Sequence, residues 1–231
     1  IREGKNAIAL TLRRSAADRI NAVPASRKAF ENCYLYTQTK RSIRDFEIAL
    51  VPDSTRKFGV LELAIVAQNG FNYDEPVTVG YDMYSPQGKL REFNMQEVTN
   101  PGRSTDTVRF TPFIYGTNAN KWEPGAKNPP LYKVMLFTRR DGAYREYMPL
   151  KIGFGKTELV DGRLTRFGKE LKLVKAGYNA AADRKTTLAE LKTLKAKGNN
   201  TICPDYPQPG WFYGLCDELG LYVIDCANIN A

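Results

Sequence analysis

Seven short segments with the two-residue alternation of β-strands follow one another between residues 41 and 155, and this run constrains the fold more than any other feature. Turn-forming residues separate the segments, as in Gln68-Asn-Gly70 and Asp141-Gly142. The segments are 42–51, 58–68, 76–84, 90–98, 106–114, 131–138 and 144–153. So many short strands in about 110 residues predict an immunoglobulin-like β-sandwich. The proline-rich stretch 122–130 suits no strand and is predicted to be a loop at the edge of the sandwich.

After residue 155 the pattern changes to strands that alternate with helices. The predicted strands are 171–174, 201–203 and 221–225, with a turn at 177–179. A capping box, Thr187-x-x-Glu190, predicts the start of a first helix that ends at Gly198, and Gly220 is predicted to end a second helix in the left-handed conformation. This β-α-β-α-β order indicates a parallel sheet, whose three strands are too few to close an eight-stranded barrel. The expected fold class is mainly β, a sandwich followed by a partial βα-barrel segment.

The first 40 residues contain two further strand candidates, at 6–12 and 33–37, with a long polar stretch between them. Two strands joined in this way cannot bury a core alone, so we expect them to complete a sheet whose other strands lie elsewhere. The chain opens with Ile1 rather than methionine, which suggests a cut inside a longer protein.

Composition excludes several kinds of partner and site. The net charge of +9 comes from scattered Lys and Arg residues without a long basic run, so no nucleic-acid partner is expected. No apolar run approaches the roughly 18 residues of a membrane span, so no membrane partner is expected either. The chain has no histidine, the usual partner in zinc sites and beside Ser or Cys nucleophiles. Its four cysteines fit neither a disulfide framework nor a zinc ribbon, and we predict free thiols, no metal and no cofactor.

Several motifs in the second half of the chain resemble one enzyme family. Leu215-Cys-Asp-Glu-Leu-Gly-Leu-Tyr-Val-Ile-Asp225, followed by Ala227-Asn-Ile229, resembles the run from the second barrel helix through the third barrel strand of glycoside hydrolase family 2, the β-galactosidase and β-glucuronidase group. Gly168-Lys-Glu-Leu-Lys-Leu173 resembles that family's entry into its barrel, and Tyr34-Leu-Tyr36 the closing strand of its jelly roll. The resemblance implies three parts: 1–40 as the tail of a jelly-roll sugar-binding domain, 41–155 as the immunoglobulin-like domain, and 156–231 as the N-terminal part of a TIM-barrel glycosidase domain.

The resemblance also implies which chemistry is missing. Family members cut O-glycosyl bonds with two carboxylates, roughly 5 Å apart, that come from later barrel strands. Where the family has His, Arg and Glu after its first three strands, this chain has 179–183 (Asn-Ala-Ala-Ala-Asp), 202–207 (Ile-Cys-Pro-Asp-Tyr-Pro) and 225–230 (Asp-Cys-Ala-Asn-Ile-Asn). The comparison implies a degenerate site and no catalytic residue in this chain. Asp217-Glu218 lies late in a predicted helix and is expected to be solvated rather than catalytic.

Three polar residues remain as weak candidates for substrate binding: Asn179, Asp205 and Asn228. The two asparagines match family positions and could bond a sugar, yet such amides equally often satisfy loop backbone. Asp205 precedes Tyr-Pro and could accept a sugar hydroxyl or simply fix a turn. Trp122 and Trp211 could stack on a sugar ring, although tryptophan is more often packed inside.

Two hypotheses about function follow. The first is a piece of a β-galactosidase-like glycoside hydrolase of carbohydrate metabolism, inactive by itself. The second is a non-catalytic carbohydrate-binding or scaffolding relative, a pseudoenzyme that kept the fold and lost the chemistry. Under either hypothesis a carbohydrate is the expected partner, and the unpaired edge of a partial barrel is expected to favour self-association.

Overall fold

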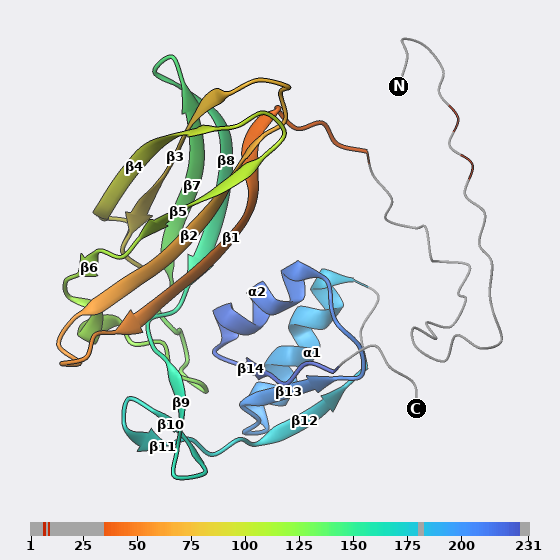
Figure 1. Cartoon of the computed structure of the whole chain (residues 1–231). Coiled ribbons are helices and arrows are strands. Elements are labelled where there is room, and N and C mark those ends of the chain that lie inside the picture. Colours follow the sequence, from red (N-terminus) through yellow and green to blue (C-terminus); the bar gives the residue numbers. More distant parts are fainter. Residues whose placement is uncertain (1–6, 8, 10–34, 180–182, 227–231) are drawn as a thin grey trace.

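The computed structural model describes residues 7, 9, 35–179 and 183–226, drawn in colour in Figure 1. The strand predicted at 6–12, and nearly all of the predicted jelly-roll tail, lie outside these residues. The strand predicted at 33–37 is wrong over the part that is described, because residues 35–39 form no strand. Leu35 and Tyr36 are each 70% exposed there, so they supply no buried face to hold a strand in place.

Two antiparallel sheets form the sandwich in the upper part of Figure 1. The first sheet has the order β1-β2-β5, and β6 pairs with the first two residues of β2. Its strands are β1 (Arg41–Pro52), β2 (Gly59–Asn69), β5 (Thr105–Phe110) and β6 (Phe113–Ile114). The second sheet has the order β4-β3-β7-β8, from β3 (Glu75–Tyr84), β4 (Leu90–Asn100), β7 (Tyr132–Arg140) and β8 (Ala143–Ile152). The predicted immunoglobulin-like sandwich is confirmed.

The core of the sandwich lies between the two sheets and comes from alternate residues of the central strands. In β2, Leu61, Leu63 and Ile65 point inward and are almost fully buried, while Glu62 between them is exposed. In β3, Tyr81 is fully buried and its ring meets Phe110 of the opposite sheet edge-on, with ring centroids 5.2 Å apart. The two-residue period of the sequence therefore sets which side chains join the sheets.

A small three-stranded antiparallel unit, which the sequence interpretation did not include, follows the sandwich. It consists of β9 (Thr157–Val160), β10 (Arg163–Arg166) and β11 (Lys169–Glu170). Its two turns, at Asp161-Gly162 and Phe167-Gly168, place both residues at positive φ, between 49° and 76°. Such turns match the twist of tight hairpins, and Asp-Gly is a strong signal for them.

A three-stranded parallel sheet with two helices completes the described chain, and we call residues 175–223 the α/β unit. Its elements are β12 (Lys175–Tyr178), α1 (Arg184–Ala196), β13 (Thr201–Pro204), α2 (Gly210–Leu219) and β14 (Tyr222–Val223). The sheet order is β12-β13-β14, and both pairings are parallel, as predicted. The seven buried core residues are Tyr178, Leu191, Ile202, Phe212, Leu215, Cys216 and Leu221.

Several predicted boundaries in this unit are wrong. The first strand is 175–178 rather than 171–174, and Gly177, predicted to lie in a turn, belongs to the strand. The third strand covers only Tyr222–Val223 of the predicted 221–225. By contrast, Gly220 ends α2 in the left-handed conformation, with φ of 70°, as predicted. A β-carbon at Gly220 would lie 3.3 Å from the Glu123 carbonyl oxygen, so the neighbouring loop also leaves little room for a side chain there.

Helix α1 begins earlier than the predicted capping box. Asp183 is its N-cap, and its Oδ1 accepts hydrogen bonds of 2.9 Å from the backbone amides of Lys185 and Thr186. Thr187, the predicted cap, is 1% exposed inside the helix, and Glu190 accepts a hydrogen bond from the Tyr178 hydroxyl instead. Tertiary packing therefore uses both residues of the apparent capping box for other contacts.

Replacing Asp183 by alanine is expected to fray the start of α1 and lower the melting temperature at neutral pH. The Thr186 hydroxyl and the two capped amides hold the pKa of Asp183 below its ordinary value of 3.8. The stabilisation by the ionised cap is therefore present above about pH 4 and disappears as the pH falls through the lowered pKa. Circular dichroism melts from pH 7 to 2 measure the effect. Asp183→Asn, which can still cap, should keep the helix without the acid dependence. A wild-type melting temperature that does not fall relative to that of Asp183→Asn between pH 7 and pH 2 would contradict this origin.

Neither α1 nor α2, the α-helices of the described residues, could span a lipid bilayer.

Candidate functional site

Two of the candidate residues lie side by side at the carboxyl edge of the parallel sheet. Asn179 follows β12 and Asp205 follows β13, and the register pairs the preceding residues, Tyr178 and Pro204. The Asp205 amide donates to the Tyr178 carbonyl oxygen over 3.3 Å, which ties the two strand ends together. Both candidates are exposed to solvent. Asn228 lies outside the described residues.

A tyrosine that sequence reasoning did not single out joins this edge to helix α2. The Tyr213 hydroxyl donates to Asp225 Oδ2 over 2.6 Å and accepts from the Gln208 amide over 3.0 Å. Burial and the bond to Asp225 raise the pKa of Tyr213 above its ordinary value. Tyr213 thus links Gln208, in the loop before α2, to Asp225, two residues after the end of β14. No sequence pattern marks it, since the contact arises only when the helix packs on the sheet.

The strand residues that the resemblance placed at or near the site do not all reach it. Ile202 was expected there in place of a charged residue, but it is fully buried in the core that faces the helices. Its neighbour Cys203 is half-buried, and Cys226 is exposed beyond β14. In the part of the chain that the structure describes, Cys203, Cys216 and Cys226 are all free thiols. Only Cys216 is fully buried.

The adjacent carboxylates late in α2 face the sandwich. Glu218 pairs with Lys151 of β8, with 2.7 Å between Oε1 and Nζ. The Asp217 side chain is exposed at one side, but the partial burial of its carboxyl group, together with the charge of Glu218, raises its pKa to about 6. Both residues are exposed, as predicted, yet they contribute to the contact between α2 and the sandwich rather than to the sheet edge.

A cleft of about 850 Å³ separates helix α2 from the sheet of β3, β7 and β8. Its walls include Lys133, Met135, Pro149 and Lys151 on the sandwich and Trp211 and Tyr213 on α2. This volume is within the range of small-molecule sites, about 300–1,000 Å³. Aromatic faces beside charged groups can stack on and hydrogen-bond a polar ligand such as a sugar. Tyr213 belongs both to this cleft and to the sheet edge.

Trp122 is not available to a ligand. It is 6% exposed, and its indole Nε1 donates to the Asp217 carbonyl oxygen over 2.9 Å. Arg166 of β10 closes the contact, since its Nε donates to the Trp122 carbonyl oxygen over 2.9 Å and its guanidinium lies 5.1 Å from the Trp122 ring. Burial lowers the pKa of Arg166, and the ring of Tyr222 lies edge-on to Trp122 at 5.4 Å. The proline-rich stretch is a loop, as predicted, and it packs against the α/β unit.

Residues in the middle of the same loop form hydrogen bonds around the turn after α2. The Gly125 amide donates to the Gly220 carbonyl oxygen over 2.8 Å. Lys195 Nζ donates to the Leu219 carbonyl oxygen over 2.6 Å and also to that of Ala126. These bonds satisfy carbonyl groups at a helix end, which otherwise lack partners.

Within residues 35–179 and 183–226, no three His, Cys, Asp or Glu side chains come together as a metal site would require. Asn179 and Asp205 expose polar side chains at the sheet edge, while the Tyr213 hydroxyl is already bonded to Asp225 and to the Gln208 amide.

No protein-family model matches the chain. It is 28% identical over 210 residues to a β-galactosidase from Halalkalibacterium halodurans, an alignment that covers 87% of this chain and 20% of that enzyme. It is 27% identical over 253 residues to a β-galactosidase from Priestia megaterium, covering 100% of this chain and 23% of that enzyme. The chain thus spans about a fifth of the length of the curated relatives it matches.

Solved structures agree with the fold. A glycosyl hydrolase family 2 member from Bacteroides cellulosilyticus superposes with a TM-score of 0.73 at 19% identity, over 82% of this chain and 27% of that one. A putative β-galactosidase from Bacteroides fragilis gives a TM-score of 0.69 at 20% identity, over 80% of this chain and 29% of that one. The sequence matches to β-galactosidases and the shared fold lead to the same group of proteins. The chain is a relative of the β-galactosidases of glycoside hydrolase family 2.

Proposed function

We propose that this chain is the part of a β-galactosidase-like glycoside hydrolase that supplies the immunoglobulin-like domain and the first three strands of the TIM barrel. In this role it supports the barrel and contributes polar residues to one side of the sugar site. The bond-cleaving carboxylates belong to barrel strands that these residues do not include. The observation that carries the proposal is the alignment with β-galactosidases along 87–100% of the chain.

The order of the parts supports this assignment. A sandwich is followed by a parallel β-α-β-α-β unit, which is how the first strands of a βα barrel are built. The candidates Asn179 and Asp205 lie at the carboxyl ends of the parallel strands, where barrel enzymes place their chemistry. The N-terminal residues 1–40 would then be the end of a jelly-roll domain.

A non-catalytic carbohydrate-binding relative is the second candidate, and one feature of the sequence favours it. By resemblance, the chain has Ala180, Ala182, Ile202 and Cys226 at or near the places where family members have His, Arg and Glu. None of these side chains can replace a charged hydrogen bond to a sugar in the transition state, and each such loss costs about 10²-fold or more in rate. Turnover of a β-galactoside by the protein that contains this chain would distinguish the two candidates.

The 231-residue chain by itself is expected not to hydrolyse nitrophenyl β-galactosides, because without two suitably placed carboxylates the leaving group is not protonated and no nucleophile is present. The rate of nitrophenol release by the pure chain should equal that of buffer, while a complete β-galactosidase in the same assay releases product. Release above buffer that decreases in an Asp205→Asn variant would contradict the proposal, because it would place a working carboxylate within these residues.

A further inference from the structure

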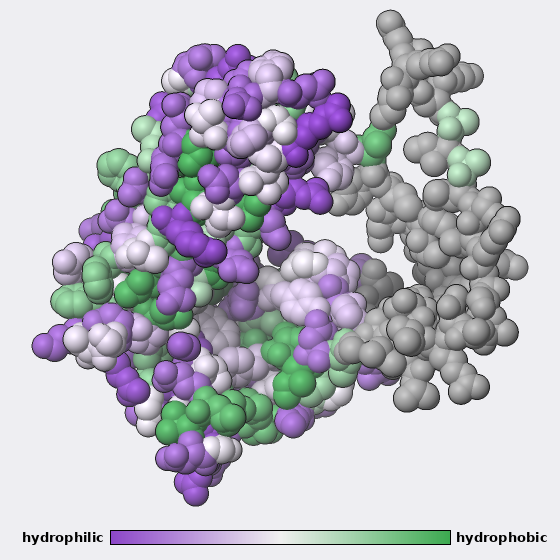
Figure 2. Space-filling model, viewed as in Figure 1, coloured by the Kyte–Doolittle hydropathy of each residue, from purple (hydrophilic) through white to green (hydrophobic). Residues whose placement is uncertain are grey.

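A second cavity, of about 350 Å³, lies at the end of the sandwich where β1 begins and the β7–β8 hairpin turns. Among the described residues that line it, none is acidic and five are basic. The polar residues of its wall are Thr39, Lys40, Arg41, Thr138, Arg139, Arg140 and Arg145. Figure 2 shows strongly hydrophilic side chains gathered over this end of the sandwich. The cavity is far along the sandwich from α2 and shares no lining residue with the cleft beside that helix.

The ring of Phe71 lies against two of the cations. Lys40 Nζ lies 5.1 Å from the centroid of the Phe71 ring, and Arg41 Cζ lies 5.3 Å from the same centroid. Such contacts orient a cation without neutralising its charge. In the described part of the chain, no ion pair involves Lys40 or Arg145. Glu146, which follows Arg145, accepts a 2.8 Å hydrogen bond from the Ile43 amide and does not line the cavity.

Three buried polar atoms in this wall have no hydrogen-bond partner: Arg41 Nε, Arg139 Nε and the Thr138 hydroxyl oxygen. Thr138 is 2% exposed, and its alternation with Val134 and Leu136 along β7 directs it between the sheets. A buried polar group without a partner costs about 1–3 kcal/mol, so a cluster of three requires an explanation. Each of the three can donate a hydrogen bond, and all three belong to residues that line this cavity.

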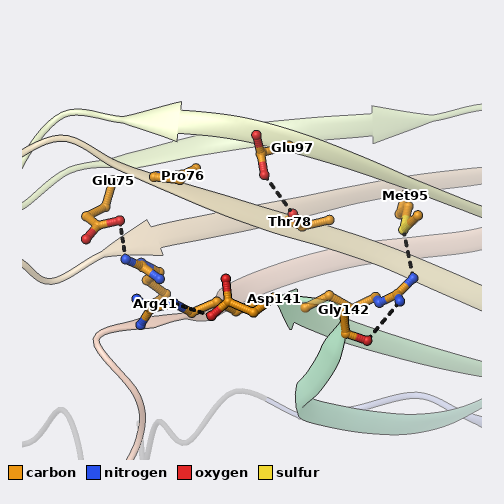
Figure 3. Close-up of a pocket in the computed structure, with 10 residues that line it drawn as sticks. Arg41, Glu75, Pro76, Thr78, Met95, Glu97, Asp141 and Gly142 are labelled. Carbon is orange, nitrogen blue, oxygen red and sulfur yellow. Dashed lines mark hydrogen bonds and ion pairs between the residues drawn. The ribbon is translucent and has the colours of Figure 1, made fainter.

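The neighbouring cavity of about 430 Å³ provides the contrast, because it shares Arg41, Arg139 and Arg140 with the first but contains acidic residues (Figure 3). On that side Arg41 pairs with Glu75, and Arg140 Nε lies 3.3 Å from Asp141 Oδ2. Arg139 Nη2 donates to the Gly142 carbonyl oxygen over 3.0 Å. The terminal nitrogens of Arg41 and Arg139 therefore have partners on the side of the 430 Å³ cavity. The Nε atoms of these two arginines and the charges of Lys40 and Arg145 remain for the 350 Å³ cavity.

We propose that the cavity at this end of the sandwich binds a sulfate or phosphate oxyanion. Lys40 and Arg145 supply the uncompensated charge, and Arg41 Nε, Arg139 Nε and the Thr138 hydroxyl supply directed hydrogen bonds. Charge-assisted hydrogen bonds of this kind are about twice as strong as neutral ones. The oxyanion can be a free inorganic ion or an ester group on a sugar, since both present the same oxygen atoms.

Isothermal titration of the full 231-residue chain with sodium sulfate, against sodium chloride at equal ionic strength, tests the site. We expect saturable sulfate binding and none with chloride. Arg145→Gln should weaken sulfate binding about tenfold, because it removes one charged donor. Arg109→Gln removes the same charge from an exposed position of β5 and should leave the affinity within about twofold. Thr138→Val, a second variant of nearly equal shape, should weaken binding without changing the net charge.

Titration with galactose 6-sulfate separates the two sources of the anion, and both outcomes support the site. Tighter binding of the sulfated sugar than of inorganic sulfate assigns the cavity to an anionic carbohydrate, and the reverse order assigns it to a free ion. Absence of saturable binding by both probes overturns the proposal. Equal losses for Arg145→Gln and Arg109→Gln also overturn it, because the attraction would then come from net charge alone. Melting curves of each variant show whether the sandwich is still folded.

Discussion

Replacing Phe212 by alanine is expected to unfold the α/β unit at temperatures where the wild-type protein is intact. Phe212 is fully buried, and its ring stacks on Tyr178 with centroids 5.5 Å apart. Removing a buried phenylalanine side chain costs about 3–5 kcal/mol, and this unit has only seven buried core residues to share the loss. Small domains are stable by about 5–15 kcal/mol in total, so the change removes a large part of what holds the unit together.

Far-UV circular dichroism measures this effect, because α1 and α2 are the α-helices of the described residues. The helical signal should melt at least about 12 °C lower than in the wild type. Phe93→Ala is the matched control, since it removes the same atoms from a side chain that is 66% exposed on β4. Its effect should stay within about 0.5 kcal/mol. A shift in Phe212→Ala as small as in the control would mean that the helices do not depend on this core.

Replacing Trp122 by alanine is expected to separate the α/β unit from the sandwich. The substitution removes the 2.9 Å hydrogen bond to the Asp217 carbonyl oxygen and the ring against which Arg166 and Tyr222 pack. Gly153 makes this fit specific, since a β-carbon there would lie 2.6 Å from Trp122 Cγ. Loss of a buried tryptophan side chain costs about 3–5 kcal/mol, and here most of that cost falls on the contact between the two units.

The expected observation is two melting transitions in place of one transition in which both units unfold together. The helical signal should be lost first and the β signal later. Trp122→Phe should give an intermediate result, because it keeps an aromatic ring but leaves the Asp217 carbonyl oxygen without its donor. Trp211→Ala is the control, since Trp211 is the other tryptophan of the chain and lines the cleft on α2 instead. A single unshifted transition in Trp122→Ala would show that the two units are held together by other contacts.

The sandwich could be predicted from sequence because its alternation records directly which residues face the core. Each of the seven predicted segments corresponds to an observed strand region, with 106–114 divided into β5 and β6. Residues 111–112 lie between these two strands, and Pro112 cannot donate to a sheet ladder. The hairpins of β9–β11 were missed although Asp161-Gly162 marks the first turn, because their strands are only two to four residues long.

The site was predicted less well, for a different physical reason. The order of strands and helices placed Asn179 and Asp205 on the same edge, and the register agrees. However, the partners of Tyr213 and Trp122 depend on how separate elements pack, and no local pattern encodes such contacts. Thr187 and Glu190 show the same limit. Their spacing matches a capping box, but Thr187 is buried inside the helix and Glu190 accepts a hydrogen bond from the Tyr178 hydroxyl.

The bond between the Trp122 indole and Asp217 joins positions 95 residues apart in the chain, and this separation bears on how the protein folds. Contacts across long stretches of chain form late, because the entropy of closing the loop must be overcome first. Every strand pairing of the sandwich lies within residues 41–152, so the surface around Trp122 can be complete before α2 is available. During synthesis the sandwich also leaves the ribosome first. The later α/β unit, with its small core, then has a finished surface on which to assemble, and the indole fluorescence of Trp122 reports the moment of docking.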